Sequence, residues 1–184
     1  MTYSIHKSID ISFAHHIRGH KGHCINMHGH TWKFEVGLMS EELDAQGFVL
    51  DFSTLKTKLL EPIHSLLDHA LAIGEDTYND IADDLEPMGV KLLASRQELH
   101  GEINTSEREV VRFEQAENRY PGGLKVAVFP FSPTSERFSK WLYDAARATL
   151  EDDRVKIRYA RIFETLHPVE SVAEYWPVKS SGES

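Results

Sequence analysis

The chain has 184 residues, of which 41% are hydrophobic and 27% charged, and its formal net charge is −9 at pH 7. This length and composition predict one soluble globular domain over residues 1–184 that is long enough to bury a hydrophobic core. The acidic balance argues against nucleic acid as the main partner, although a local cationic pocket can still bind an anionic small molecule. The sequence shows no membrane span, no signal peptide and a single cysteine, so we expect a cytoplasmic protein.

Two predicted strands flank a histidine-rich loop near the N-terminus. Apolar residues occupy the odd positions from Tyr3 to Phe13, which is typical of a half-buried strand. A second strand is predicted from His28 to Met39, with its apolar side chains on even positions. Alternate strand residues share a face, so His28 and His30 project together onto the apolar side. Residues 17–26, with two glycines and several polar residues, are predicted to form the loop between the strands.

A helix follows the second strand, and a long irregular segment follows the helix. Leucine and isoleucine recur with helical spacing over residues 53–67, and Asp51 or Ser53 can cap the start of this helix. The next stretch, 72–123, is acidic, weakly periodic and interrupted by glycine and proline. We expect it to be a long insertion that is partly helical near residues 80–100.

The C-terminal third is predicted to complete the domain with one more helix and further strands. The helix is expected over residues 134–150, with Ser132 as N-cap and Pro133 at the first helical position. The order of elements predicts an α+β fold with helices on one face of an antiparallel sheet. Strands are predicted at Lys125–Phe129, Val155–Thr165 and around residues 171–176.

Six of the eleven histidines lie between His15 and His30, which suggests a metal site. Two imidazoles on an apolar strand face are costly without a partner, so His28 and His30 are candidate ligands. His15 is the candidate third ligand, because a hairpin would lay the end of the first strand beside the second. Three histidines with one coordination position open are typical of catalytic zinc. The alternative is that these are polar residues without metal, and loop residues His20 and His23 are better explained in that way.

Three further groups are candidates for chemistry. Cys24 lies among lysine and histidine residues, so it can be a reactive thiolate, a fourth zinc ligand or an inert buried thiol, and its spacing alone does not decide. Asp68 and His69 are adjacent and can form an oriented proton-transfer pair or a simple surface dipeptide. Glu164 is predicted on the strand face opposite Ile157, Tyr159 and Phe163. There it can bind an N–H edge of a ligand, or be a solvated strand residue or an ion-pair partner.

Six short motifs occur in an order that is informative as a set. They resemble the 6-pyruvoyltetrahydropterin synthase family, which includes bacterial 6-carboxytetrahydropterin synthase, and they cover residues 3–71 and 130–176. The motifs are Phe13-Ala14-His15, Cys24-x-x-x-His28-Gly29-His30, Gly47-Phe48-Val49-Leu50-Asp51-Phe52, Leu67-Asp68-His69, Pro133-Thr134-Ser135-Glu136 and Phe163-Glu164-Thr165.

The resemblance implies a tunnelling fold, with a four-stranded antiparallel sheet and two helices on its outer face. It also implies homo-oligomers, in which trimers close the sheets into a barrel and pair as hexamers with active sites between subunits. The implied roles are Zn2+ ligation by His15, His28 and His30, catalysis by Cys24, Asp68 and His69, and pterin binding by Glu164 assisted by Thr165.

The implied substrate is 7,8-dihydroneopterin triphosphate. Loss of triphosphate and acetaldehyde would give 6-carboxytetrahydropterin, a step towards queuosine-type deazapurines, and the compact spacing of Cys24 from the His28-Gly29-His30 motif favours this product. Loss of triphosphate alone would give 6-pyruvoyltetrahydropterin, a step towards tetrahydrobiopterin. The chain departs from the family pattern at His16, where many relatives have arginine, and in segment 72–123. These departures leave open a competing ligand at His16 and a non-catalytic, zinc-containing pterin-binding protein.

Overall fold

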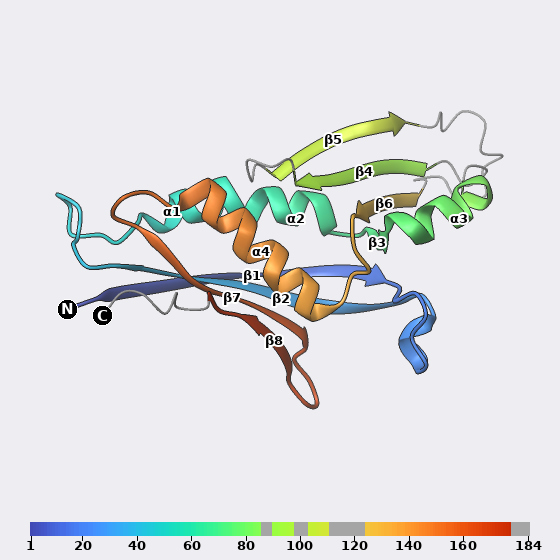
Figure 1. The fold of residues 1–184 in the computed structure, drawn as a ribbon, viewed down its shortest axis with the longest axis horizontal. Helices are drawn as coiled ribbons and strands as arrows, with labels where there is room; N and C mark the ends of the chain where they lie inside the picture. The colour runs from blue at the N-terminus through green and yellow to red at the C-terminus, as the bar shows by residue number, and fades with distance from the viewer. Residues whose placement is uncertain (86–89, 98–102, 111–123, 178–184) are drawn as a thin grey trace.

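The computed structural model describes residues 1–85, 90–97, 103–110 and 124–177, which form a mixed sheet with helices packed on one side (Figure 1). The strands are β1 (Tyr3–His15), β2 (His28–Ser40), β3 (Leu71–Gly74), β4 (Val90–Gln97), β5 (Ile103–Val110), β6 (Leu124–Phe129), β7 (Lys156–Thr165) and β8 (Ser171–Tyr175). The helical segments are the 3-10 turn η1 (His23–Ile25), α1 (Phe52–Leu55), the π-helical η2 (Lys56–Leu60), α2 (Glu61–Leu67), α3 (Glu75–Leu85) and α4 (Ser135–Leu150). Within these residues the sheet order is β5-β4-β6-β3-β1-β2-β7-β8.

The antiparallel half of the sheet, β1-β2-β7-β8, confirms the predicted hairpin and four-stranded core. The register places His15 opposite His28 and Phe13 opposite His30. The continuous helical run α1-η2-α2 and helix α4 cover the same face of these strands (Figure 1). Apolar side chains from both layers are fully or almost fully buried between them, among them Trp32, Phe34, Leu59, Ile63, Phe138 and Leu142.

The other half of the sheet is partly parallel and extends the expected architecture. Strand β3 pairs in parallel with β1 and β6, and β6 pairs in parallel with β4. The expected strand near residues 125–129 is therefore confirmed as β6. The expectation of partial helix near residues 80–100 is confirmed up to Leu85, whereas residues 90–97 form a strand that pairs with β5 and β6. Residues 86–89 and 98–100 lie outside the described part of the chain. No helix in the described ranges is long and apolar enough to cross a membrane.

Helix α4 begins later than its sequence predicts. Its N-cap is Thr134, whose hydroxyl accepts a hydrogen bond of 3.3 Å from the backbone N–H of Arg137, so the predicted cap at Ser132 is wrong. Pro133 therefore lies outside the helix, where its carbonyl is free to accept a bond from elsewhere. The predicted cap at Asp51 is confirmed, since its carboxylate accepts from the Ser53 backbone N–H at 2.6 Å.

A bulge changes which side chains of β7 face the core. The register between β2 and β7 shifts between Gly37 and Leu38, so that Ile157 lies opposite Leu38 and Tyr159 lies opposite Gly37. The predicted common face for Ile157, Tyr159 and Phe163 is therefore wrong, because one extra residue reverses the alternation. Ile157 and Ile162 both face the helices, and Glu164, two residues after Ile162, points to the same side.

Candidate active site

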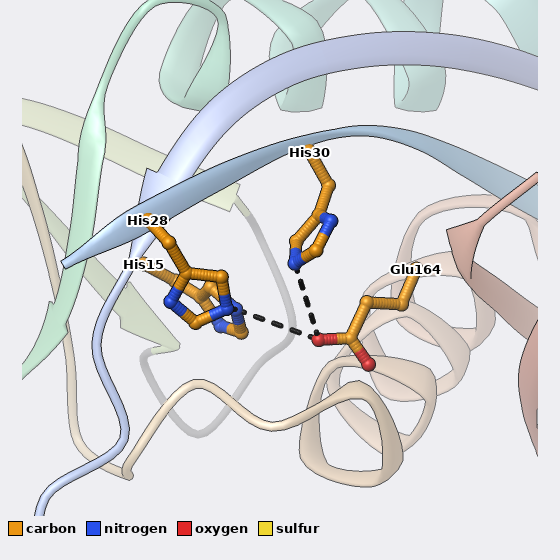
Figure 2. A group of neighbouring side chains, drawn as sticks. All are labelled: His15, His28, His30 and Glu164. Atoms are coloured by element: carbon orange, nitrogen blue, oxygen red, sulfur yellow. Dashed lines mark hydrogen bonds and ion pairs between the residues drawn. The ribbon is translucent and has the colours of Figure 1, made fainter. Parts of the chain in front are cut away.

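Three histidines and one glutamate converge at the end of the antiparallel half of the sheet. Figure 2 shows His28 and His30 extending from β2 beside His15, with Glu164 approaching from β7. One ligand atom from each of the four side chains lies within 4.8 Å of the others. The structure thus brings together the three histidines that the sequence singles out as metal ligands, and it adds Glu164 to them.

Hydrogen bonds to backbone carbonyls fix the orientation of two imidazoles. Nδ1 of His15 lies 2.9 Å from the carbonyl of Pro133, and Nδ1 of His28 lies 2.8 Å from the carbonyl of Asn26. A carbonyl oxygen only accepts, so each Nδ1 carries the proton and each Nε2 of the neutral rings presents a lone pair. The same arrangement, with a carbonyl behind each imidazole, orients histidine ligands around metals.

The Nε2 atoms of His15 and His28 lie close enough together to favour a cation between or beside them. They lie 3.1 Å apart, and two lone pairs at this distance repel unless a proton or a metal ion sits nearby. Nε2 of His30 is buried and has no hydrogen-bond partner within the described residues. Three imidazole nitrogens that leave a fourth coordination position open are a ligand set of catalytic zinc. The residues present therefore fit a zinc ion.

Burial keeps two of these imidazoles neutral. Burial lowers the pKa of His15, and this outweighs the opposing hydrogen bond to Pro133 and the nearby carboxylate of Glu164. Burial also lowers the pKa of His30, against the attraction of Glu164. Metal binding requires unprotonated imidazole, so both rings are ready to bind a metal near neutral pH.

Glu164 is held between the histidines and the start of α4. Its Oε1 lies 3.5 Å from Nε2 of His15 and 3.8 Å from Nε2 of His30 (Figure 2). Its Oε2 accepts a hydrogen bond of 2.7 Å from the hydroxyl of Ser135. From the sequence, Ser135 is predicted only as part of a helix start. The one sequence signal for its contact with Glu164 is the Pro133-Thr134-Ser135-Glu136 motif.

The Trp32 side chain packs against His15 and His30. Its side chain is fully buried, and its ring meets His15 and His30 edge-on at centroid distances of 4.8 and 5.5 Å. The Phe13 ring stacks on the Trp32 ring at a centroid distance of 4.8 Å. This rigid aromatic packing fixes the two strands that carry the histidines.

Asp68 and His69 form the predicted hydrogen-bonded pair directly after α2, and neither residue belongs to the cluster of three histidines and Glu164. Nδ1 of His69 donates to Oδ2 of Asp68 at 2.8 Å, directly after α2. The His69 side chain is 84% exposed, and its φ of 59° is left-handed, which is uncommon for a residue other than glycine. Desolvation opposes ionisation of Asp68, but the bond from His69 and the nearby His64 and Lys125 charges hold the pKa of this carboxyl below its usual value.

The remaining candidates lie around the site. Cys24 is partly buried on the short turn η1, and it is not one of the four clustered ligands found among the described residues. His16 is likewise outside that cluster. His20 and His23 are exposed, as expected of loop residues. Thr165 ends β7 next to Glu164.

Comparison with known proteins identifies the family. The family model described as 6-pyruvoyl tetrahydropterin synthase matches residues 4–177. The chain belongs to this family. A curated relative, the 6-carboxy-5,6,7,8-tetrahydropterin synthase of Haemophilus influenzae, is 24% identical over 166 residues, which cover 89% of this chain and 93% of the relative.

Solved structures show the same tunnelling fold. A Wolinella succinogenes protein superposes with a TM-score of 0.67 and 24% identity, covering 96% of this chain and 98% of its own. The 6-pyruvoyl tetrahydropterin synthase of Caenorhabditis elegans superposes with a TM-score of 0.55 and 15% identity, covering 97% of each chain. The fold predicted from the sequence motifs is therefore confirmed. The site belongs to a member of a family of pterin-processing enzymes.

Proposed function

We propose that this protein is a zinc-dependent lyase that converts 7,8-dihydroneopterin triphosphate and one water molecule to 6-carboxytetrahydropterin, triphosphate and acetaldehyde. The observation that supports metal dependence is the 3.1 Å distance between the Nε2 atoms of His15 and His28. In each of these rings Nδ1 is hydrogen-bonded to a backbone carbonyl. The carboxy product is supported by the name of the Haemophilus influenzae relative, which aligns over 89% of this chain. Such a product would feed queuosine-type deazapurine synthesis.

His15, His28 and His30 would hold the zinc ion, and it supplies Lewis acidity towards the hydroxyl groups of the substrate side chain. The rest of the chemistry belongs to side chains of the protein. Cys24, as a thiolate, is the base that takes a proton from the substrate side chain. His69 exchanges a proton at Nε2, since its Nδ1 is bound by Asp68. Glu164 binds the amino-pyrimidine edge of the pterin, with assistance from Thr165.

We also propose that the active site is completed between copies of the chain, in a trimer or hexamer. His69 donates its backbone N–H to the carbonyl of Ser12 on β1, whereas Glu164 comes from β7, which lies beyond β2 in the sheet order. Strand β8 ends the described sheet with an unpaired edge, and an open edge favours pairing with another strand.

The test is turnover of dihydroneopterin triphosphate by the purified zinc-loaded protein, with triphosphate and acetaldehyde measured in the same tube. Release of both supports the proposal. Triphosphate without acetaldehyde would instead favour the pyruvoyl product, which the family name allows. Tight pterin binding with neither product would show a zinc-containing pterin-binding protein and overturn the proposed activity.

A further inference from the structure

The peptide group between Asp68 and His69 is held from both sides. Its carbonyl, on Asp68, accepts a hydrogen bond of 2.7 Å from Nζ of Lys125. Its N–H, on His69, donates a hydrogen bond of 2.8 Å to the carbonyl of Ser12 on β1. Two bonds at opposite ends of one peptide unit fix the orientation of its plane.

The orientation of this plane determines the backbone conformation of His69. The φ of 59° puts His69 in the left-handed region, which a residue with a side chain adopts only when its surroundings impose it. Rotation about φ also swings the side chain, so the same restraint directs the exposed imidazole. The bond from Ser12 alone leaves the carbonyl end of the peptide free to turn.

Lys125 is well placed to supply the second restraint. It lies on β6, whose neighbours in the sheet are β3 and β4, so its backbone is anchored on both sides. Its ammonium also donates to the carbonyl of Ser65 at 2.8 Å, in the last turn of α2. A cation at this position complements the partial negative charge at a helix C-terminus. One side chain thereby joins the end of α2 to the peptide that precedes His69.

We propose that Lys125 is a positioning residue for the Asp68–His69 pair, and that through it strand β6 sets the direction of the His69 imidazole. This inference rests on the proposed function, in which His69 transfers a proton. It assigns a role to a strand for which the sequence motifs of the family resemblance give no function. Lys125 itself is not expected to contact the substrate.

Replacement of Lys125 by methionine removes the donors and keeps the length of the side chain. In the zinc-loaded K125M protein we expect kcat to fall about tenfold or more, because a displaced catalytic group loses orientation, with KM and zinc content unchanged. The K125R protein, whose guanidinium can again bridge the two carbonyls, should recover most of kcat. The matched control is K58M, which alters an exposed lysine of η2 and should behave as wild type.

Hydrogen–deuterium exchange of the peptide covering residues 66–71 provides a readout that does not depend on turnover. Exchange at the His69 amide should be slow in the wild type, faster in K125M and restored in K125R, with α4 unchanged in all three. If wild-type protein shows no turnover, the proposed function fails while exchange still decides the role of Lys125. Wild-type kcat in K125M, or equal exchange at residues 66–71, would overturn the inference. If K125M does not fold, rapid exchange of the His69 amide in the wild type would overturn it.

Discussion

The hydroxyl of Ser135 donates a hydrogen bond of 2.7 Å to Oε2 of Glu164, joining the first turn of α4 to the end of β7. The carboxylate is thereby fixed with its other oxygen towards the histidines, 3.5 Å from Nε2 of His15. A carboxylate held in this way is preorganised to bind a ligand beside the three histidines. The contact joins residues 29 positions apart in the sequence, on elements with different periodicity.

Replacement of Ser135 by alanine should weaken substrate binding. A hydrogen bond to a charged group contributes about 1.5–3 kcal/mol, so we expect KM for dihydroneopterin triphosphate to rise about tenfold or more. Steady-state kinetics measures the effect. The control is S139A, which removes another buried hydroxyl of α4 that bonds only the Glu136 carbonyl in the described contacts. Equal KM values in S135A and S139A would contradict the role given to Ser135.

Removal of a histidine ligand should remove the metal. The H28A and H30A proteins should bind less than about a tenth of the zinc that the wild type binds, because each keeps only two of the three imidazole ligands assigned to the metal. Elemental mass spectrometry of protein purified with zinc measures the stoichiometry. H23A, in which an exposed histidine of the same region is replaced, should retain the metal. Full zinc content in H28A would show that the assigned ligands are wrong.

The metal-free protein should lose stability as the pH falls. Burial lowers the pKa of His15 and His30 below the ordinary value of 6.5, so the unfolded chain binds protons at these positions first. The contribution of these two histidines to the free energy of unfolding is therefore fully present above pH 6.5 and is lost as the pH falls from 6.5 towards the lowered pKa values. Thermal unfolding of chelator-treated protein at about pH 8 and about pH 5.5 tests this effect. The H30Q protein should show a smaller decrease, and an identical decrease would contradict the assignment for His30.

Replacement of Gly37 by alanine should destabilise the fold. A Cβ at this position would lie 2.3 Å from the Tyr159 ring, in the bulged region where β2 meets β7. Such overpacking costs about 1–3 kcal/mol in the free energy of unfolding, measurable by denaturant titration. The same substitution in a Y159A background should cost much less. Equal costs in the two backgrounds would show that the ring does not occupy this space.

The parts of the site that depend on local pattern could be predicted from the sequence. His28 and His30 share a face because they are two residues apart on one strand, and the hairpin then fixes His15 opposite His28. The Asp68–His69 hydrogen bond also lies between neighbours in the chain. These features require only strand alternation and one short-range pairing.

The parts that depend on distant pairing could not be predicted in the same way. Glu164 lies on the helix-facing side of β7 because the bulge near Gly37 reverses the alternation along the strand. No periodicity in the sequence of β7 reveals this bulge. Residues 90–97 form a strand because β5 and β6 lie beside them, and their own sequence has no strong strand pattern. The hydrogen bond from Lys125 to the Asp68 carbonyl joins residues 57 positions apart in the sequence, and no sequence pattern predicts it.

The most direct measurement is mass spectrometry of the pterin formed when the zinc-loaded protein is incubated with 7,8-dihydroneopterin triphosphate. It distinguishes the two possible products by mass and reports unchanged substrate if there is no reaction. We predict 6-carboxytetrahydropterin as the product, and none of it in the C24A protein that still binds zinc. Recovery of unchanged dihydroneopterin triphosphate, or of 6-pyruvoyltetrahydropterin alone, would contradict the proposed reaction.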